Sequence, residues 1–168
     1  MNTYIQEIKD LSIGFKSQKG EQISILRNIT TNIRKGETVG IVGESGSGKS
    51  TLALAMMGYI KHGLFTTGGE CLFKSQDLLS LNNKELEDIR GRKIAMIPQN
   101  AGQALTPNLK IGYQIEEALK LHTEFNKIER EQKSSELWNQ VRLPSPTIMA
   151  LRYPHELSGG QQQRVAVA

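Results

Sequence analysis

Apolar and polar residues alternate along two stretches near the N-terminus. In residues 5–15 and 23–33, apolar side chains recur at roughly alternate positions, which predicts two β-strands. The turn between them, residues 17–20, is too short for a crossover, so we expect the strands to be antiparallel. A third run, residues 37–42, is rich in β-branched residues and predicts a short buried strand.

The rest of the chain mixes short apolar runs with helical periodicity. Apolar residues at helical spacing predict helices at 111–121 and 128–141. The segment 82–91 opens with asparagine, has glutamate three residues later and ends in glycine, which predicts a capped helix. Short apolar runs at 70–73 and 93–97 predict two further strands. The pattern therefore indicates an α/β fold.

A glycine-rich loop follows the predicted strand at 37–42 and precedes a run of good helix formers. It reads GESGSGKST and fits the phosphate-loop pattern GxxxxGK[ST]. Glycines bring backbone N–H groups close to phosphate oxygens, while Lys49 would reach the β- and γ-phosphates and Ser50 would ligate Mg²⁺. The alternative is a glycine-rich turn without a ligand. We expect the phosphates of a bound nucleotide to contact this loop, which consists of Gly43, Glu44, Ser45, Gly46, Ser47, Gly48, Lys49, Ser50 and Thr51 and is the ATP-binding segment in the family named below.

Composition narrows the class of protein. With 168 residues, 38% of them hydrophobic and 23% charged, the chain can form a soluble domain with a real core. The net charge is +4 without a basic run, which argues against nucleic acid as a partner. The single cysteine, Cys71, excludes an internal disulfide, and we interpret it as a core residue.

Targeting and membrane signals are weak. The N-terminus lacks the basic start and apolar stretch of a signal peptide. The longest apolar run, Leu52–Ile60, is far shorter than the roughly 20 residues that a membrane span needs. We therefore expect a cytosolic protein that reaches a membrane only through a partner.

A second glycine motif lies near the C-terminus, where Leu157–Arg164 reads LSGGQQQR. Ser158 is a good N-cap candidate for a helix that starts just after it. No stop signal ends that helix before Ala168, which predicts that the chain is the N-terminal part of a longer one.

These motifs carry a resemblance to a known family. The glycine loop at Gly43–Thr51, the tripeptide Ile97–Gln99 and the LSGGQ segment, in this order, resemble the nucleotide-binding subunit of an ABC transporter. The resemblance implies a P-loop NTPase fold with an N-terminal antiparallel β-subdomain and a helical subdomain. It also implies a partial domain over residues 1–168. Its parts would be 1–100 with the phosphate-loop core, 101–157 with the Q-loop and helical subdomain, and 158–168 with the start of the signature helix.

Longer stretches resemble one subfamily, the oligopeptide, dipeptide and nickel importers. They are RGRKIAMIPQN at 90–100, LTP at 105–107 and RYPHELSGGQQQR at 152–164. The sequence departs from the subfamily at Asn100–Ala101, where Asp-Pro is usual.

The resemblance also implies roles for single residues. Phe15 matches the aromatic residue that stacks on adenine, although from its pattern it fits a strand core equally well. Gln99 matches the glutamine that reaches Mg²⁺ and the attacking water, so Ser50 and Gln99 are the expected magnesium ligands. Ser158, Gly159, Gly160 and Gln161 match the signature that binds the γ-phosphate of ATP held by an opposing subunit.

Catalysis in this family needs residues that follow the signature: an aspartate for Mg²⁺, a glutamate as general base and a histidine. No acidic residue follows Glu156 in this sequence. We therefore expect a fragment truncated before the Walker B strand, which carries that aspartate. Such a fragment would have no catalytic residue, little ATPase activity of its own and an unpaired apolar sheet edge.

The resulting hypothesis is the ATP-binding subunit of an importer at the cytoplasmic face of the cell membrane. Its partners would be a second nucleotide-binding subunit, as homodimer or heterodimer, permease subunits and, indirectly, an extracytoplasmic solute-binding protein. The solute could be a peptide, nickel or a metal chelate. The alternatives are a DNA-repair or chromosome-type ATPase, a translation-factor ATPase and a non-catalytic regulatory subunit. The short spacing between Gln99 and Leu157 argues against the long coiled coil of chromosomal proteins.

Overall fold

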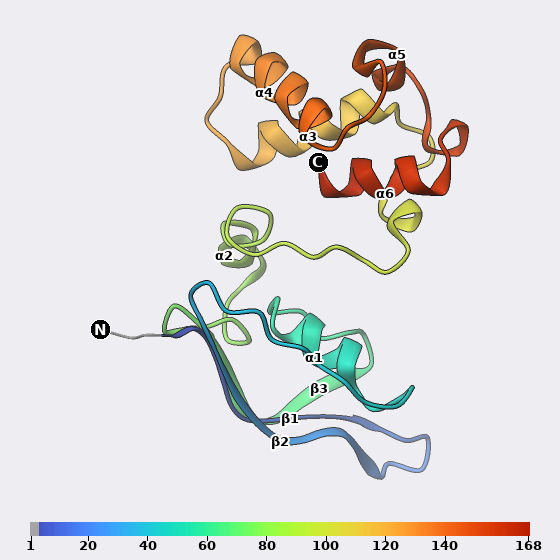
Figure 1. Cartoon of the computed structure of the whole chain (residues 1–168). Helices are drawn as coiled ribbons and strands as arrows, with labels where there is room; N and C mark the ends of the chain where they lie inside the picture. The colour runs from blue at the N-terminus through green and yellow to red at the C-terminus, as the bar shows by residue number, and fades with distance from the viewer. Residues whose placement is uncertain (1–3) are drawn as a thin grey trace. The chain divides into compact units, whose positions relative to one another are not determined.

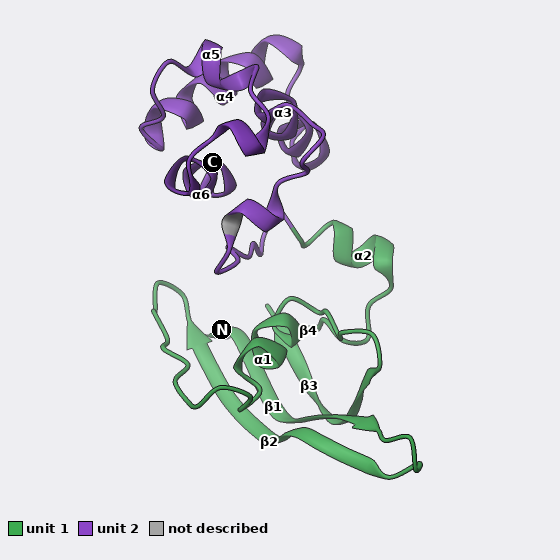
Figure 2. Cartoon of the chain, turned by 90° about the vertical axis from the view of Figure 1, so that its right-hand side faces the viewer, with its two compact units in different colours: residues 1–90 green, residues 91–168 purple. Residues whose placement is uncertain are grey.

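The computed structural model describes residues 4–168, except for the side chain of Ala101. The chain forms two compact units that are divided in sequence between Arg90 and Gly91 (Figure 2). The finer division after residues 100 and 157, expected from the sequence, stays a prediction. Residues 1–3 of the first expected part, 1–100, lie outside the described residues.

The first unit is built on an antiparallel sheet with strand order β2-β1-β3-β4, of which β1, β2 and β3 are labelled in Figure 1 and β4 in Figure 2. Strand β1 (Tyr4–Lys16) pairs with β2 (Gln22–Arg34) on one side and with β3 (Leu64–Phe73) on the other, and β4 (Gln76–Asp77) extends β3. The predicted antiparallel pairing of the first two strands is confirmed. Strand β3 begins well before the predicted 70–73 segment.

Helix α1 (Lys49–Ala55) covers the apolar face of this sheet. Its Leu52 and Ala55 share one buried cluster with residues of β1, and the register shift between Ile8 and Leu11 explains why the alternation in the sequence is only approximate. Cys71 of β3 is 0% exposed in the same cluster, so its predicted place in the core is confirmed. The buried members of the cluster are Ile8, Leu11, Ile13, Leu26, Leu52, Ala55 and Cys71.

Helix α2 (Asn83–Glu87) begins as the sequence predicts. The Asn82 side chain accepts from the Glu85 backbone N–H at 3.1 Å, and the Glu85 carboxylate accepts from the Asn82 N–H at 2.9 Å. The predicted helix end at Gly91 is wrong, because α2 stops at Glu87. Gly91 instead has φ +79°, and its N–H donates to the Ile94 carbonyl at 2.9 Å.

Two predicted strands are not formed. Residues 37–42 lack regular secondary structure, and residues 93–97 contain only an isolated bridge at Ile94. A strand needs a neighbour to bond its backbone, and none of the described segments pairs with residues 37–42. Most apolar side chains of the two segments are exposed, among them Val42 at 92%, whereas Ile94 is partly buried.

The second unit is helical. The helices predicted at 111–121 and 128–141 are confirmed with small shifts at their ends. Trp138 is buried, and its Nε1 donates to Ser134 Oγ at 3.1 Å. The helices are α3 (Ile111–His122), α4 (Lys127–Gln140), α5 (Pro146–Ala150) and α6 (Gly159–Val167), with 3₁₀ turns η1 (Ala101–Ala104) and η2 (Pro154–Glu156).

One apolar cluster holds these helices together. It is formed by Leu105, Ile111, Ile115, Trp138, Leu143, Met149, Leu157 and Val165. Leu157 and Val165 bracket the glycines of the LSGGQ segment, so the core fixes both ends of that segment while its middle stays at the surface.

Candidate functional site

The glycine loop has a backbone that only glycine adopts easily. Gly48, the N-cap of α1, has φ +90°, and a Cβ added there would lie 2.7 Å from Leu26 Cδ2. A Cβ at Gly43 would lie 2.9 Å from Ser47 Oγ. Side chains at these two positions would therefore push the loop away from the strand beneath it or distort its turn.

Lys49 folds back over this loop. Its Nζ donates to the Gly43 carbonyl at 2.8 Å, to the Glu44 carbonyl at 2.5 Å and to Ser47 Oγ at 3.4 Å. The ammonium group therefore closes the loop into a ring and stays at the protein surface. A charge fixed at this point suits an anion that also contacts the loop backbone.

The start of α1 offers N–H groups to the same region. Gly48 has no side chain with which to cap the helix, and the first turn holds no acidic residue. The free N–H groups and the positive end of the helix dipole therefore meet no competing anion from the helix itself. Ser50 lies in this turn with an exposed side chain.

The side chains of the candidate site fit a Mg²⁺ ion that shares its ligands with water and phosphate better than they fit a metal ion held by protein side chains alone. In the described part of the chain, His, Cys, Asp and Glu side chains do not gather in groups of three or more that could hold a metal ion. Mg²⁺ bound through a hydroxyl, an amide oxygen, water and phosphate oxygens needs no such cluster.

Phe15 lies near the end of β1, where it pairs with Ile23 of β2 and Leu64 of β3. Its side chain is half-buried and does not belong to the buried cluster beneath α1. Adenine stacking by Phe15 stays a prediction, and a partly exposed ring is compatible with it.

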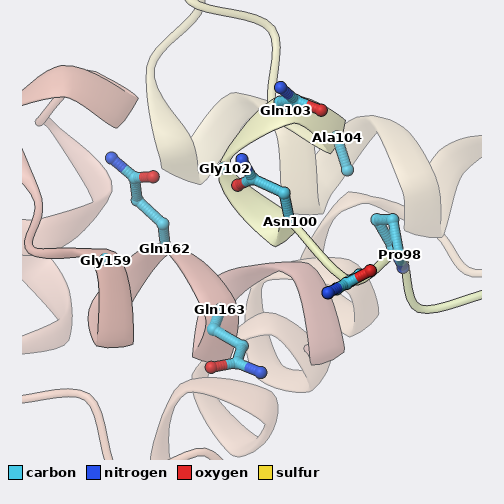
Figure 3. Close-up of a pocket in the computed structure, with 9 residues that line it drawn as sticks. Pro98, Asn100, Gly102, Gln103, Ala104, Gly159, Gln162 and Gln163 are labelled. Atoms are coloured by element: carbon cyan, nitrogen blue, oxygen red, sulfur yellow. The ribbon is translucent and has the colours of Figure 1, made fainter.

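Gln99 and the LSGGQ helix line one pocket of the second unit, with a volume of about 670 Å³ (Figure 3). One side of the pocket is the exposed Gln99 with the η1 turn that follows it, and the other is the start of α6. The lining residues are Pro98, Gln99, Asn100, Gly102, Gln103, Ala104, Gly159, Gln162 and Gln163. The structure thus brings together two segments that are far apart in the sequence.

The predicted N-cap at Ser158 is confirmed. Ser158 Oγ accepts from the Gln161 N–H at 3.4 Å, and Gln161 Oε1 accepts from the Ser158 N–H at 2.9 Å. A Cβ at Gly159 or Gly160 would meet nothing within 4 Å among residues 4–168, so packing within the described part of the chain does not require glycine there. Glycine at such open positions is useful when another molecule approaches the backbone closely.

The sequence does not predict a role for Gln162, the residue that follows this motif. Gln162 Nε2 donates to the Pro154 carbonyl at 2.8 Å and to the Leu157 carbonyl at 3.2 Å. Consecutive helical residues point about 100° apart, so only one of three adjacent glutamines can face η2. The sequence does not say which, because the helix phase is set by the burial of Val165 in the core.

No helix among residues 4–168 combines the length and apolar character needed to cross a bilayer.

Comparison with known proteins identifies relatives. Residues 26–168 match the family model described as ABC transporter. The chain is 40% identical over 173 residues to the oligopeptide transport ATP-binding protein OppD of Bacillus subtilis (strain 168), covering 99% of this chain and 46% of that protein. It is 40% identical over 161 residues to the dipeptide transport ATP-binding protein DppD of Escherichia coli (strain K12), covering 96% and 49%. The chain thus spans about half the length of these curated relatives.

Solved structures agree with this relationship. A dimeric post-hydrolysis state of the ATP-binding cassette MJ0796, bound to ADP and Pi, has a TM-score of 0.82 and 32% identity, covering 96% of this chain and 67% of that one. A second dimeric structure of MJ0796, a bacterial ABC transporter cassette, has a TM-score of 0.81 at the same identity and coverage. The chain therefore belongs to the ABC transporter family and has the fold of its nucleotide-binding domain.

Proposed function

We propose that the chain binds Mg-ATP through Gly43–Thr51 as part of the ATP-binding subunit of an importer. The observation that carries the proposal is the loop itself, where Lys49 lies over backbone carbonyls beside an uncapped helix start. Together these groups form a site that a polyphosphate would complete.

Each residue has a distinct role in this proposal. Lys49 contacts the β- and γ-phosphates, and the hydroxyl of Ser50 ligates Mg²⁺. Gln99 is the second magnesium contact and orients the attacking water, while Phe15 stacks on adenine. Magnesium would supply charge neutralisation between the phosphates; this chain's own residues bind and orient the nucleotide.

Ser158–Gln161 is the proposed contact with ATP held by a second nucleotide-binding subunit. The free space around Gly159 and Gly160 supports this role, because none of the residues that the structure describes packs within 4 Å of a Cβ built there. The described neighbour MJ0796 is dimeric in two structures, one of which holds ADP and Pi. The second subunit of this protein is an identical or a related chain.

Peptides are the proposed solute class. The relatives OppD and DppD are named for oligopeptide and dipeptide transport, which favours peptides over nickel or metal chelates. The permeases, and not this chain, would contact the solute. Binding to the permeases would hold this chain at the cytoplasmic face of the membrane. The relatives do not favour the DNA-repair or translation-factor alternative.

Hydrolysis belongs to the proposed full subunit. Glu156 is the last acidic residue among these 168, and we propose that the full subunit supplies the general base. Loss of a positioned base typically lowers the rate about 10²–10⁴-fold, and we expect the 168-residue chain to bind ATP without efficient turnover.

Hydrogen exchange tests the proposed nucleotide site. Mg-ATP is expected to slow exchange of backbone amides in peptides covering 43–52, because those N–H groups would bond phosphate oxygens. The α4 peptide, residues 127–140, is the internal control and is expected to stay unchanged. Equal exchange of the loop peptide with and without saturating Mg-ATP would overturn the proposal.

A further inference from the structure

Gln162 ties the first turn of α6 to the chain that leads into it. Its amide nitrogen donates to the carbonyls of Pro154 and Leu157, at 2.8 Å and 3.2 Å. Both acceptors precede Ser158, whereas Gln162 follows the signature glycines. One partly buried side chain therefore clamps the LSGGQ segment from both ends.

The same side chain also meets the turn after Gln99. A Cβ added to Gly102 of η1 would lie 2.2 Å from Gln162 Oε1, a distance at which one of the two groups must move. The backbone of Gly102 is outside the left-handed region. Alanine at this position would therefore force the end of the Gln162 side chain to shift, while the backbone of residue 102 would not be strained.

We propose that Gln162 is a positioning residue that links the η1 turn to the signature segment. When η1 moves toward α6, it displaces Gln162 Oε1, and the amide then leaves the carbonyls of Pro154 and Leu157. The start of α6 loses its clamp in the same step. In this proposal the Gln162 side chain has two arrangements, the one bonded to these carbonyls and a displaced one, as coupling between sites requires.

This inference rests on the proposed function, because that function assigns a nucleotide contact to each of the two segments that Gln162 links. Gln99 is the proposed contact with the subunit's own nucleotide, and Ser158–Gln161 the proposed contact with the nucleotide of the second subunit. Gln162 would let the occupancy of one site alter the shape of the other. It touches neither nucleotide in this scheme, so it positions other groups and does not take part in the chemistry.

The neighbouring glutamine provides a matched control. Gln163 lines the same pocket, but its side chain is exposed and makes no hydrogen bond within the described residues. Gln162 and Gln163 leave α6 in different directions (Figure 3). Gln163→Ala therefore removes the same atoms from the next position without breaking the clamp.

The test is a double-mutant cycle read by hydrogen exchange of the whole chain without nucleotide. Gln162→Ala is expected to speed exchange in peptides covering 154–162 about 5–30-fold, the range that corresponds to the loss of one to two ordinary hydrogen bonds. Gly102→Ala is expected to speed exchange in the same peptides, because its methyl group displaces Gln162. The double variant is expected to match Gln162→Ala alone, because the short side chain leaves room for the methyl group.

The link would be overturned by effects that simply multiply in the double variant, by a Gly102→Ala effect confined to residues 99–105, or by Gln163→Ala behaving like Gln162→Ala. Gln162→Glu keeps the shape and removes the donor, so it is expected to loosen residues 154–162, and normal protection there would contradict the clamp. Faster exchange that spreads to α3 would mean a general structural role and would also overturn the link. Because the cycle uses no nucleotide, its failure is distinguishable from a failure of ATP binding.

Discussion

The ammonium group of Lys49 donates to the carbonyl of Gly43 at 2.8 Å, so the two ends of the glycine loop are joined by a single side chain. The bond shapes the loop and places a positive charge at its centre. Loop conformation and anion binding therefore depend on the same residue, and substitutions in the loop should separate into those that change its shape and those that change its charge.

Gly48→Ala is expected to destabilise the first unit more than Gly46→Ala. Both glycines have positive φ, +90° and +83°, but only at Gly48 would the new Cβ clash, at 2.7 Å from Leu26 Cδ2. Backbone strain costs about 1–2 kcal/mol at either site, and overpacking adds about 1–3 kcal/mol at Gly48. Urea unfolding measures both variants, and equal losses would contradict the close packing of the loop on β2.

Gly160→Ala tests whether the second glycine of the signature is needed for the stability of the chain or only for contact with a second subunit. The added methyl meets nothing within 4 Å in the described structure, and alanine favours a helix over glycine by about 1 kcal/mol, so the free energy of unfolding should rise or stay unchanged. Ser158→Ala, which removes the N-cap, should lower it by about 0.5–2 kcal/mol. Chemical denaturation of the two variants compares them directly. A destabilised Gly160→Ala variant would mean that this glycine serves the fold of the chain itself.

Exposed apolar residues at 39–42 should promote self-association. Val39, Ile41 and Val42 lie in an unpaired segment, and such edges pair readily with other chains. Val42→Lys is expected to lower the average mass measured by light scattering, because a charge opposes edge pairing. The control Thr66→Lys adds the same charge at an exposed position of the paired strand β3. A monodisperse monomer for the unmodified chain would count against this expectation.

The buried thiol of Cys71 is expected to lower the stability of the folded chain as the pH rises in the alkaline range. Burial raises the pKa of its thiol to about 11 from 9.0; a hydrogen bond from Gln6 opposes this effect, and the nearby charge of Asp77 adds to it. Because the folded pKa is higher than the unfolded one, the stabilising contribution is full below pH 9.0 and is lost as the pH rises toward about 11. Thermal unfolding of the chain and of Cys71→Ala between these pH values checks the expectation. A parallel loss in both proteins would assign the pH effect to other groups.

Local patterns predicted most of the elements that the chain forms. The alternation in 5–15 and 23–33 and the helical spacing in 111–121 reflect burial on one face, which is a local property of the sequence. The capping glutamate at Glu85 predicted the helix start for the same reason.

Features that depend on distant partners could not be predicted in this way. Residues 37–42 have the composition of a strand, but pairing requires a neighbour that the pattern itself cannot supply. The contact of Gln162 with Gly102 depends on how α6 packs in the core, and no local feature of three consecutive glutamines reveals it. The motif residues were found because glycine, lysine and serine at fixed spacing report the chemistry directly.

Equilibrium binding of Mg-ATP to the chain tests the central claim most directly. The unmodified chain and the control Lys35→Ala, which removes an exposed lysine outside the loop, are expected to bind the nucleotide with equal affinity. Lys49→Ala is expected to bind about 10–100-fold more weakly, since a hydrogen bond to a charged group contributes about 1.5–3 kcal/mol. Saturable binding that is lost only in Lys49→Ala is the predicted result. Binding of equal strength by Lys49→Ala, or no binding by the unmodified chain, would contradict the proposed site.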